Sequence, residues 1–137
     1  MITFNYETEF KLIMKTKITS WISDTIVNEA FKEGDINYIF CGDDYLLDIN
    51  VKYLKHNALT DIISFDYSLG KKLSGDIFIS VDRVKDNSVK YEVNFDDELH
   101  RVIIHGILHF CGYKDKTKED KRLMRKKEDY YLSLRTF

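Results

Sequence analysis

The sequence lacks proline altogether and has only six glycines among its 137 residues. This composition excludes the proline-rich and glycine/serine-rich linkers that separate domains, and no internal repeat is present. Hydrophobic residues account for 44% of the chain and charged residues for 32%, which is typical of a folded globular domain. We therefore expect one continuous domain spanning residues 1–137.

Cysteines and long apolar runs are scarce as well. The two cysteines, Cys41 and Cys111, form no CxxC pair, which argues against a redox site and suits a reducing compartment. No stretch approaches the roughly 20 apolar residues of a membrane span. The first ten residues also lack the basic and then apolar pattern of a signal peptide. These features predict a cytoplasmic protein without a membrane partner.

A net positive charge is also missing, because 21 basic residues face 23 acidic ones. The overall charge therefore does not indicate nucleic-acid binding. The distribution is uneven, however, with eight basic and three acidic residues in the segment 114–127. This basic end could bind phosphate groups, although a solvated C-terminal helix of mixed charge would have the same composition.

Hydrophobic periodicity predicts strands alternating irregularly with helices. Strands are expected at 2–6, 36–40, 61–67 and 75–81, the last two paired in one sheet. Helices are expected at 17–33, 43–53, 81–91, 94–111 and 117–131. The second helix is expected to be capped by Asp43 or Asp44, the fourth by Asn94 or Asp96, and the fifth by Thr117. Gly112 is expected to end the fourth helix. This order predicts the α+β class: a small mixed sheet packed by helices, with a helix resembling that of zinc hydrolases near the C-terminus.

The segment 105–115, HGILHFCGYKD, is the one that indicates chemistry. In a helix, His105 and His109 lie one turn apart on a polar strip, close enough to share one metal ion. Gly112 allows the chain to turn, and Asp115 then offers a carboxylate. Two histidines, a glycine and a further donor at these offsets follow the spacing of the metzincin zinc motif. A pair of partly buried histidines without a metal is the alternative explanation.

Three protein ligands would leave a fourth position of a zinc ion open, as in catalytic zinc sites that activate water. Zinc peptidases of this pattern carry a glutamate directly after the first histidine as general base. Here that position is Gly106, and Glu98 on the same strip lies about 10 Å from His105 along the helix axis. The pattern therefore argues against a peptidase.

Three motifs together resemble the YbeY-type endoribonucleases, also called rRNA maturation factors. They are HGILHFCGY, LTDIISFD and SGDIFIS, which occur in the family's order within residues 47–115. The resemblance implies a small α+β domain and a zinc ion held by the last motif. It also implies single-strand-specific endoribonuclease activity in rRNA maturation, notably 16S rRNA 3′-end processing, and a part in ribosome quality control on the small ribosomal subunit.

The sequence departs from the family pattern at three positions. Asp115 stands where the family usually has a third metal histidine, so zinc is expected at one ion per chain but another divalent ion is possible. Leu54 replaces a family arginine, and Lys52 and Lys55 beside it could supply charge without the bidentate grip of arginine. Asp66 replaces the family proline.

The favoured hypothesis is a metal-dependent endoribonuclease whose metal ligands are His105, His109 and Asp115, with the general base unassigned. Ser64 and Asp76 are expected to be structural or to support the site from behind its ligands. The RNA backbone would bind basic side chains near the motifs: Lys52, Lys55, Lys114, Lys116, Lys118, Lys121, Arg122 and Arg125. Two alternatives stay open, a metallohydrolase of another substrate such as a peptide, and a non-catalytic ribosome-associated factor with a structural metal. The sequence does not indicate an oligomeric state.

Overall fold

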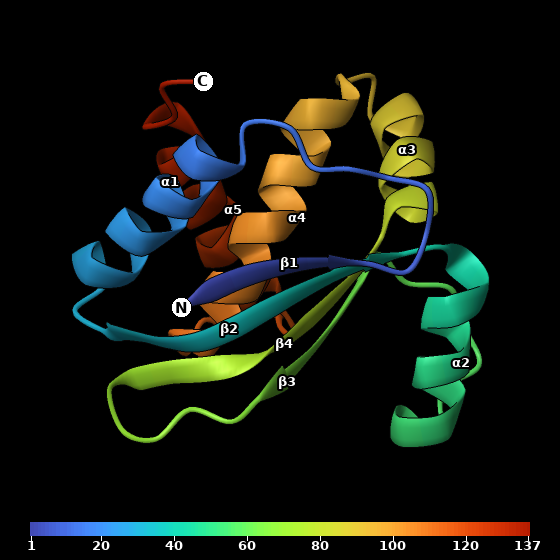
Figure 1. The fold of residues 1–137 in the computed structure, drawn as a ribbon, viewed down its shortest axis with the longest axis horizontal. Coiled ribbons are helices and arrows are strands. Elements are labelled where there is room, and N and C mark those ends of the chain that lie inside the picture. Colours follow the sequence, from blue (N-terminus) through green and yellow to red (C-terminus); the bar gives the residue numbers. More distant parts are fainter.

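The computed structural model describes residues 1–137 as a four-stranded sheet with helices on both faces (Figure 1). The elements in chain order are β1 (Ile2–Tyr6), α1 (Lys15–Asn28), β2 (Lys32–Cys41), α2 (Asp43–Leu54), β3 (Ile62–Asp66), β4 (Lys72–Ser80), α3 (Val81–Lys90), α4 (Phe95–Phe110) and α5 (Lys118–Ser133). The predicted α+β class is confirmed. No helix is long and apolar enough to cross a membrane.

The sheet is mixed, in the order β1-β2-β4-β3. Strands β1, β2 and β4 are parallel, whereas β3 is an edge strand antiparallel to β4, as its predicted pairing required. Helices α1, α4 and α5 lie over one face, and α2 packs on the other face against β3 and β4 (Figure 1). One face of β3 therefore looks toward α4.

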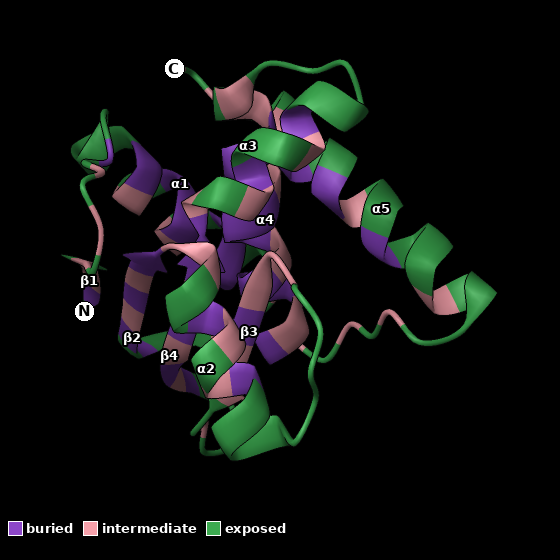
Figure 2. Ribbon diagram, turned by 90° about the vertical axis from the view of Figure 1, so that its right-hand side faces the viewer, coloured by how far each residue is buried: buried purple, intermediate pink, exposed green.

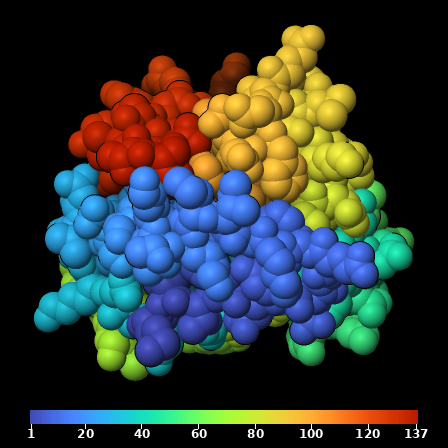
Figure 3. Space-filling model, turned by 45° about the horizontal axis from the view of Figure 1, so that its top comes forward, coloured from blue at the N-terminus to red at the C-terminus, as the bar shows by residue number.

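The main core, of 22 buried residues, fills the space between the sheet and helices α1, α4 and α5. Helix α4 is buried along most of its length (Figure 2), as its nearly continuous apolar circumference predicts. The hydroxyl of Tyr38 on β2 donates to the Ile103 carbonyl of α4 at 2.9 Å. The indole of Trp21 on α1 donates to the Tyr131 carbonyl of α5 at 2.8 Å. Figure 3 shows this contact region from outside, with the N-terminal segment bordering α5 and α4.

Three predicted helix boundaries are confirmed by their caps. The Asn94 side chain accepts from the backbone N–H of Asp97 at 2.7 Å, and Ser80 caps α3. Thr117 and Asp120 form the reciprocal capping box that begins α5. Gly112, at φ 100°, follows the end of α4 as predicted.

Two helix-boundary predictions are wrong, and β2 begins at Lys32, four residues before the predicted strand 36–40. The first helix ends at Asn28 and not at Glu33, because Ala30 takes a left-handed conformation (φ 65°) and the Phe31 N–H bonds the Ile26 carbonyl at 3.0 Å. This is a Schellman ending formed without glycine.

Helix α2 is not capped by Asp43 or Asp44, since its N-cap position is Gly42. The Asp43 N–H is instead satisfied by the Asp82 carboxylate at 2.9 Å, and the Asp43 carboxylate accepts from Arg83 and Ser80. The cap is thus supplied from α3, a long-range contact that local sequence does not indicate.

Candidate metal and RNA site

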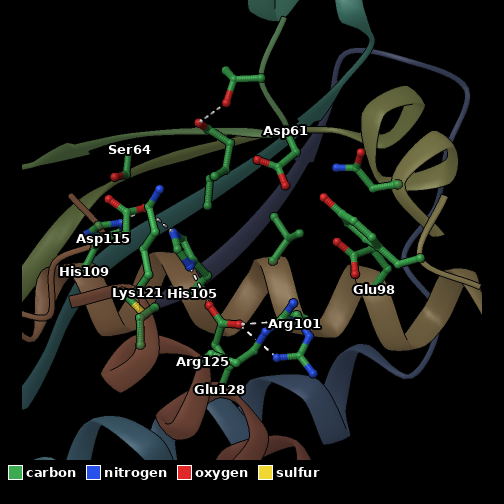
Figure 4. Close-up of a pocket in the computed structure, with 16 residues that line it drawn as sticks. Asp61, Ser64, Glu98, Arg101, His105, His109, Asp115, Lys121, Arg125 and Glu128 are labelled. Carbon is green, nitrogen blue, oxygen red and sulfur yellow. Dashed lines mark hydrogen bonds and ion pairs between the residues drawn. The ribbon is translucent and has the colours of Figure 1, made fainter. Parts of the chain in front are cut away.

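The two histidines of the α4 motif lie on the wall of a pocket of about 430 Å³ (Figure 4). Strand β3, helices α3, α4 and α5, and the loop after α4 contribute its lining. Helix α4 packs closely on the sheet at Gly106, where a Cβ would lie 3.0 Å from Ile77 and 3.2 Å from Ile62. The glycine therefore lets α4 carry both histidines next to β3.

The structure brings together the three side chains predicted as metal ligands. The Asp115 Oδ2 atom lies 3.3 Å from His105 Nε2 and 3.2 Å from His109 Nε2. One donor atom from each of the three residues lies within 4.8 Å of the other two. The chain turns back at Gly112, whose φ of 100° is accessible to glycine at little cost. Two imidazole nitrogens and a carboxylate oxygen are a donor set that suits a divalent transition metal.

The loop that carries Asp115 is tied to the body of the protein by a partly buried carboxylate, that of Glu29. The Tyr113 hydroxyl donates to Glu29 Oε1 at 2.7 Å, and the Tyr131 hydroxyl donates to the other oxygen of Glu29. Lys127 Nζ lies 3.5 Å from the same carboxylate. Although burial alone would raise the pKa of Glu29, these partners lower it below its usual value. The loop therefore has a fixed attachment to α1 and α5.

Glu128 of α5 orients one of the histidines. Its Oε2 lies 2.6 Å from His105 Nδ1, and Arg101 donates to its other oxygen at 2.9 Å (Figure 4). The Glu128 residue is only 5% exposed. Burial would lower the pKa of His105, but the hydrogen bond and charge of Glu128 outweigh it, so this pKa is raised. The contact engages Nδ1 and leaves Nε2 facing Asp115, the arrangement seen when a carboxylate supports a metal-binding histidine.

Two further carboxylates, Asp61 and Glu98, line the same pocket on the side away from Asp115 (Figure 4). Burial raises the pKa of both groups, and the charge of Asp61 contributes to the raised pKa of Glu98. Carboxyl groups of raised pKa in a cleft are suited to proton transfer. No contact joins either one to His105 directly.

Of the basic residues predicted to bind RNA, two line the pocket, namely Lys121 and Arg125. Lys52 lies on α2 with its Nζ 3.7 Å from Asp48, and Arg122 pairs with Glu119 on the exposed side of α5. The remaining ones lie outside the pocket lining: Lys55, Lys114, Lys116 and Lys118. The pocket itself therefore offers Lys121, which forms no ion pair, and Arg125, whose Nη1 lies 3.8 Å from Glu128 Oε1.

The two strand residues expected to be structural lie on opposite faces of the sheet. Ser64 is paired with Ile77 on the face toward α4 and lines the pocket. Asp76 points the other way, because successive side chains of a strand alternate, and accepts from Asn37 at 3.0 Å. Asp76 thus belongs to a polar ladder outside the site.

Sequence reasoning missed Glu128 and Asp61 as parts of this site. Glu128 is 23 residues from His105, so only the packing of α5 on α4 brings the two together. The acidic pair Glu128 and Asp129, directly after the basic segment, could have indicated this contact, because both pair with Arg101 on the polar strip of α4. Asp61 follows Thr60 just before a strand, a position where these two residue types usually form a turn, so no local pattern indicated that Asp61 belongs to a site.

Comparison with known proteins agrees with this architecture. The family model described as Endoribonuclease YbeY matches residues 3–135. The relative named Endoribonuclease YbeY from Flavobacterium johnsoniae is 58% identical over 134 residues, covering 98% of this chain and 96% of the relative. The relative of the same name from Cytophaga hutchinsonii is 49% identical over 135 residues, covering 98% and 94%.

A solved structure supports the fold independently. The solution structure of TM1509 from Thermotoga maritima matches with a TM-score of 0.71 at 24% identity, covering 97% of this chain and 87% of that one. At this identity the likeness concerns the fold alone. Taken with the family match over nearly the whole chain, the chain belongs to the Endoribonuclease YbeY family.

Proposed function

We propose that the protein is a metal-dependent endoribonuclease that cleaves single-stranded ribosomal RNA, acting in the cytoplasm on the 16S rRNA 3′ end of the small ribosomal subunit. Residues 1–137 would form one such domain. The observation that carries the proposal is the convergence of His105, His109 and Asp115 within 4.8 Å, in a pocket that also holds Lys121 and Arg125. Relatives with 49% and 58% identity bear the name Endoribonuclease YbeY.

The donor set fits a metal ion. Two imidazole nitrogens and one carboxylate oxygen match zinc, and we propose one zinc ion per chain held by His105, His109 and Asp115. The oxygen donor makes another divalent ion the alternative, because carboxylates also suit harder cations. Glu128 would hold His105 in the tautomer with a proton on Nδ1, so that Nε2 keeps its lone pair for the ion.

A bound ion supplies Lewis-acid chemistry, since it polarises a phosphoryl oxygen and activates water. The protein's own side chains would do the rest. Arg125 and Lys121 would bind the non-bridging oxygens of the RNA phosphate, where the guanidinium offers a bidentate fork and the lysine a point charge. Asp61 and Glu98, with raised pKa, are the carboxyl groups of the pocket placed to accept and return protons.

A peptidase is not favoured by the packing at Gly106. The glutamate that zinc peptidases carry at this position would start from a Cβ already 3.0 Å from Ile77 and 3.2 Å from Ile62. A glutamate there would require the Ile77 and Ile62 side chains, or α4 itself, to shift. The non-catalytic alternative has no comparable structural support, because both the phosphate-binding cations and the acidic groups line the same pocket as the triad.

The proposal is tested by cleavage of a short single-stranded RNA with wild type, His109→Ala and Asp115→Ala. We expect the wild type to cleave, a chelator to stop cleavage, and zinc to restore it. Both variants should lose cleavage while keeping RNA binding and a cooperative unfolding transition. Asp24→Ala, which removes an exposed carboxylate on α1, is the matched control and should cleave normally. Undiminished cleavage by His109→Ala would refute the metal mechanism, and joint loss of folding and binding would favour a structural metal.

A further inference from the structure

A second hollow, of about 400 Å³, lies along the free edge of β3. Strand β3 pairs only with β4. The Ser80 N–H donates to the Asp61 carbonyl at 2.9 Å, and the Tyr67 N–H donates to the Ser74 carbonyl at 2.8 Å. Odd-numbered residues of this strand therefore direct their backbone toward β4. In an antiparallel pair the alternate residues, Ile62 and Ser64, direct theirs outward. Both residues line the hollow.

The opposite wall is built by the end of α2 and the loop after it. Asn50, only 5% exposed, donates through Nδ2 to the Ala58 carbonyl at 2.9 Å, and its own carbonyl accepts from the His56 N–H at 3.1 Å. Lys55 between them adopts a left-handed conformation, with φ 56°. These bonds fix the loop, so the hollow has a defined shape.

The Asn50 side chain also presents an acceptor to the hollow. Its Oδ1 atom receives no hydrogen bond within the protein, yet the protein contains no buried side-chain polar atom without a partner. Oδ1 is therefore accessible, and Asn50 lines the hollow. Together with His56 and the outward backbone of β3, it gives the hollow a polar edge that can accept and donate hydrogen bonds.

The composition of the hollow differs from that of the metal pocket. Half of its lining is apolar and none of it is an acid, a lysine or an arginine: Asn50, Leu54, His56, Ala58, Thr60, Ile62, Ile63 and Ser64. The metal pocket, in contrast, holds arginines, lysine and carboxylates. The two share Thr60, Ile62 and Ser64, so they adjoin across β3. An ionic pocket joined to an uncharged one matches a nucleotide, in which a phosphate is linked to a flat, uncharged base.

We propose that this hollow is a nucleobase subsite, which binds the base of a nucleotide next to the phosphate held in the metal pocket. The inference rests on the proposed endoribonuclease function and names where the RNA base binds. Leu54 and Ala58 contact the faces of the base, and Asn50 Oδ1 and His56 bond its polar edge. A base must be unpaired to enter, so the subsite selects single-stranded RNA.

The test combines a protein variant that fills the hollow with RNA from which a single base has been removed. Ala58 is exposed, so Ala58→Leu adds bulk to the lining without disturbing the core, and Asn57→Leu places a leucine in the same loop outside the lining. Dissociation constants are measured by fluorescence anisotropy on the zinc-loaded protein with a cleavage-resistant single-stranded RNA. A single abasic nucleotide is placed at each position of the RNA in turn.

For the wild type and Asn57→Leu, we expect one abasic position to weaken binding about tenfold, the size typical of a base contact in single-strand-binding sites. For Ala58→Leu that position should lose its effect, and intact RNA should bind about as weakly as the abasic RNA. Leu54→Ala, which removes an apolar contact without adding bulk, should reduce the abasic effect severalfold. If Ala58→Leu keeps the full abasic effect, the subsite is wrong while RNA cleavage stands. If the wild type neither binds nor cleaves RNA, both proposals are wrong.

Discussion

Glu128 Oε2 and His105 Nδ1 lie 2.6 Å apart, joining α5 to α4 directly behind the proposed metal ligands. The contact belongs to an ionic cluster in which Arg101 bonds the other Glu128 oxygen at 2.9 Å. Because the carboxylate fixes the ring and strengthens the basicity of Nε2, the proposed metal affinity of His105 would depend on a residue of another helix.

Glu128→Gln should weaken zinc binding by about 10- to 100-fold without unfolding the protein, since the amide keeps the shape but loses the charge. Competition with a chromophoric chelator measures the affinity, and circular dichroism checks the fold. Glu119→Gln, on the exposed side of the same helix, is the control and should bind zinc like the wild type. An unchanged affinity in Glu128→Gln would contradict the orienting role.

Gly106→Glu should destabilise the protein by about 1–3 kcal/mol or more, because the new side chain meets Ile77 and Ile62 at the helix–sheet contact. Urea unfolding measures the loss. The variant should also fail to gain peptidase activity despite its complete zinc-peptidase motif. A variant as stable as the wild type would show that the helix–sheet contact at this position accommodates a side chain at no cost.

Sequence reasoning succeeded where the determinant was local. Thr117 and Asp120 form the capping box that their spacing predicts, and Gly112 ends α4 with the same Schellman bonds that its residue type favours. The end of α1 uses those bonds too, but with Ala30 in the left-handed position. Alanine carries no signal for that conformation, so the predicted helix was too long by several residues.

The residues of the site also fall into those that local sequence predicts and those that only packing brings in. His105, His109 and Asp115 lie within eleven residues of one another, and helical spacing with a glycine turn was enough to bring them together. Glu128 and Asp61 arrive from α5 and from the start of β3, through packing that no local pattern describes. The sequence also did not predict which basic residues of the segment 114–127 line the pocket, because this depends on which face of α5 packs against α4.

His100 should make the stability of the protein depend on pH. Burial and the charge of Arg135, whose Nη1 lies 2.7 Å from His100 Nδ1, lower the pKa of His100 to about 4. In the unfolded chain the pKa is near 6.5, so between these values the unfolded state binds a proton that the folded state does not. Stability therefore falls as pH decreases from about 6.5 to about 4.

The expected loss from this group is about 2 kcal/mol between about pH 7.5 and pH 5. Urea unfolding of wild type and His100→Gln at both pH values isolates the contribution, because the carboxylates are common to both proteins. The glutamine keeps an acceptor for Arg135 but does not titrate. Equal pH dependence in the two proteins would show that folding does not shift the pKa of His100.

Asp115→His should change the metal preference of the site. Three imidazole nitrogens form a softer donor set than two imidazoles and a carboxylate, so the affinity for zinc relative to manganese should increase by about tenfold. Affinities for both ions are compared by competition titration of wild type and variant. If the ratio does not change, Asp115 does not contribute an oxygen ligand.

The most direct test of the metal centre is the metal content of the untagged protein, purified without chelator and analysed by elemental analysis together with His109→Ala. The account predicts about one zinc per chain in the wild type and none in the folded variant. A well-folded wild type that holds no divalent metal, even after incubation with zinc, would contradict it.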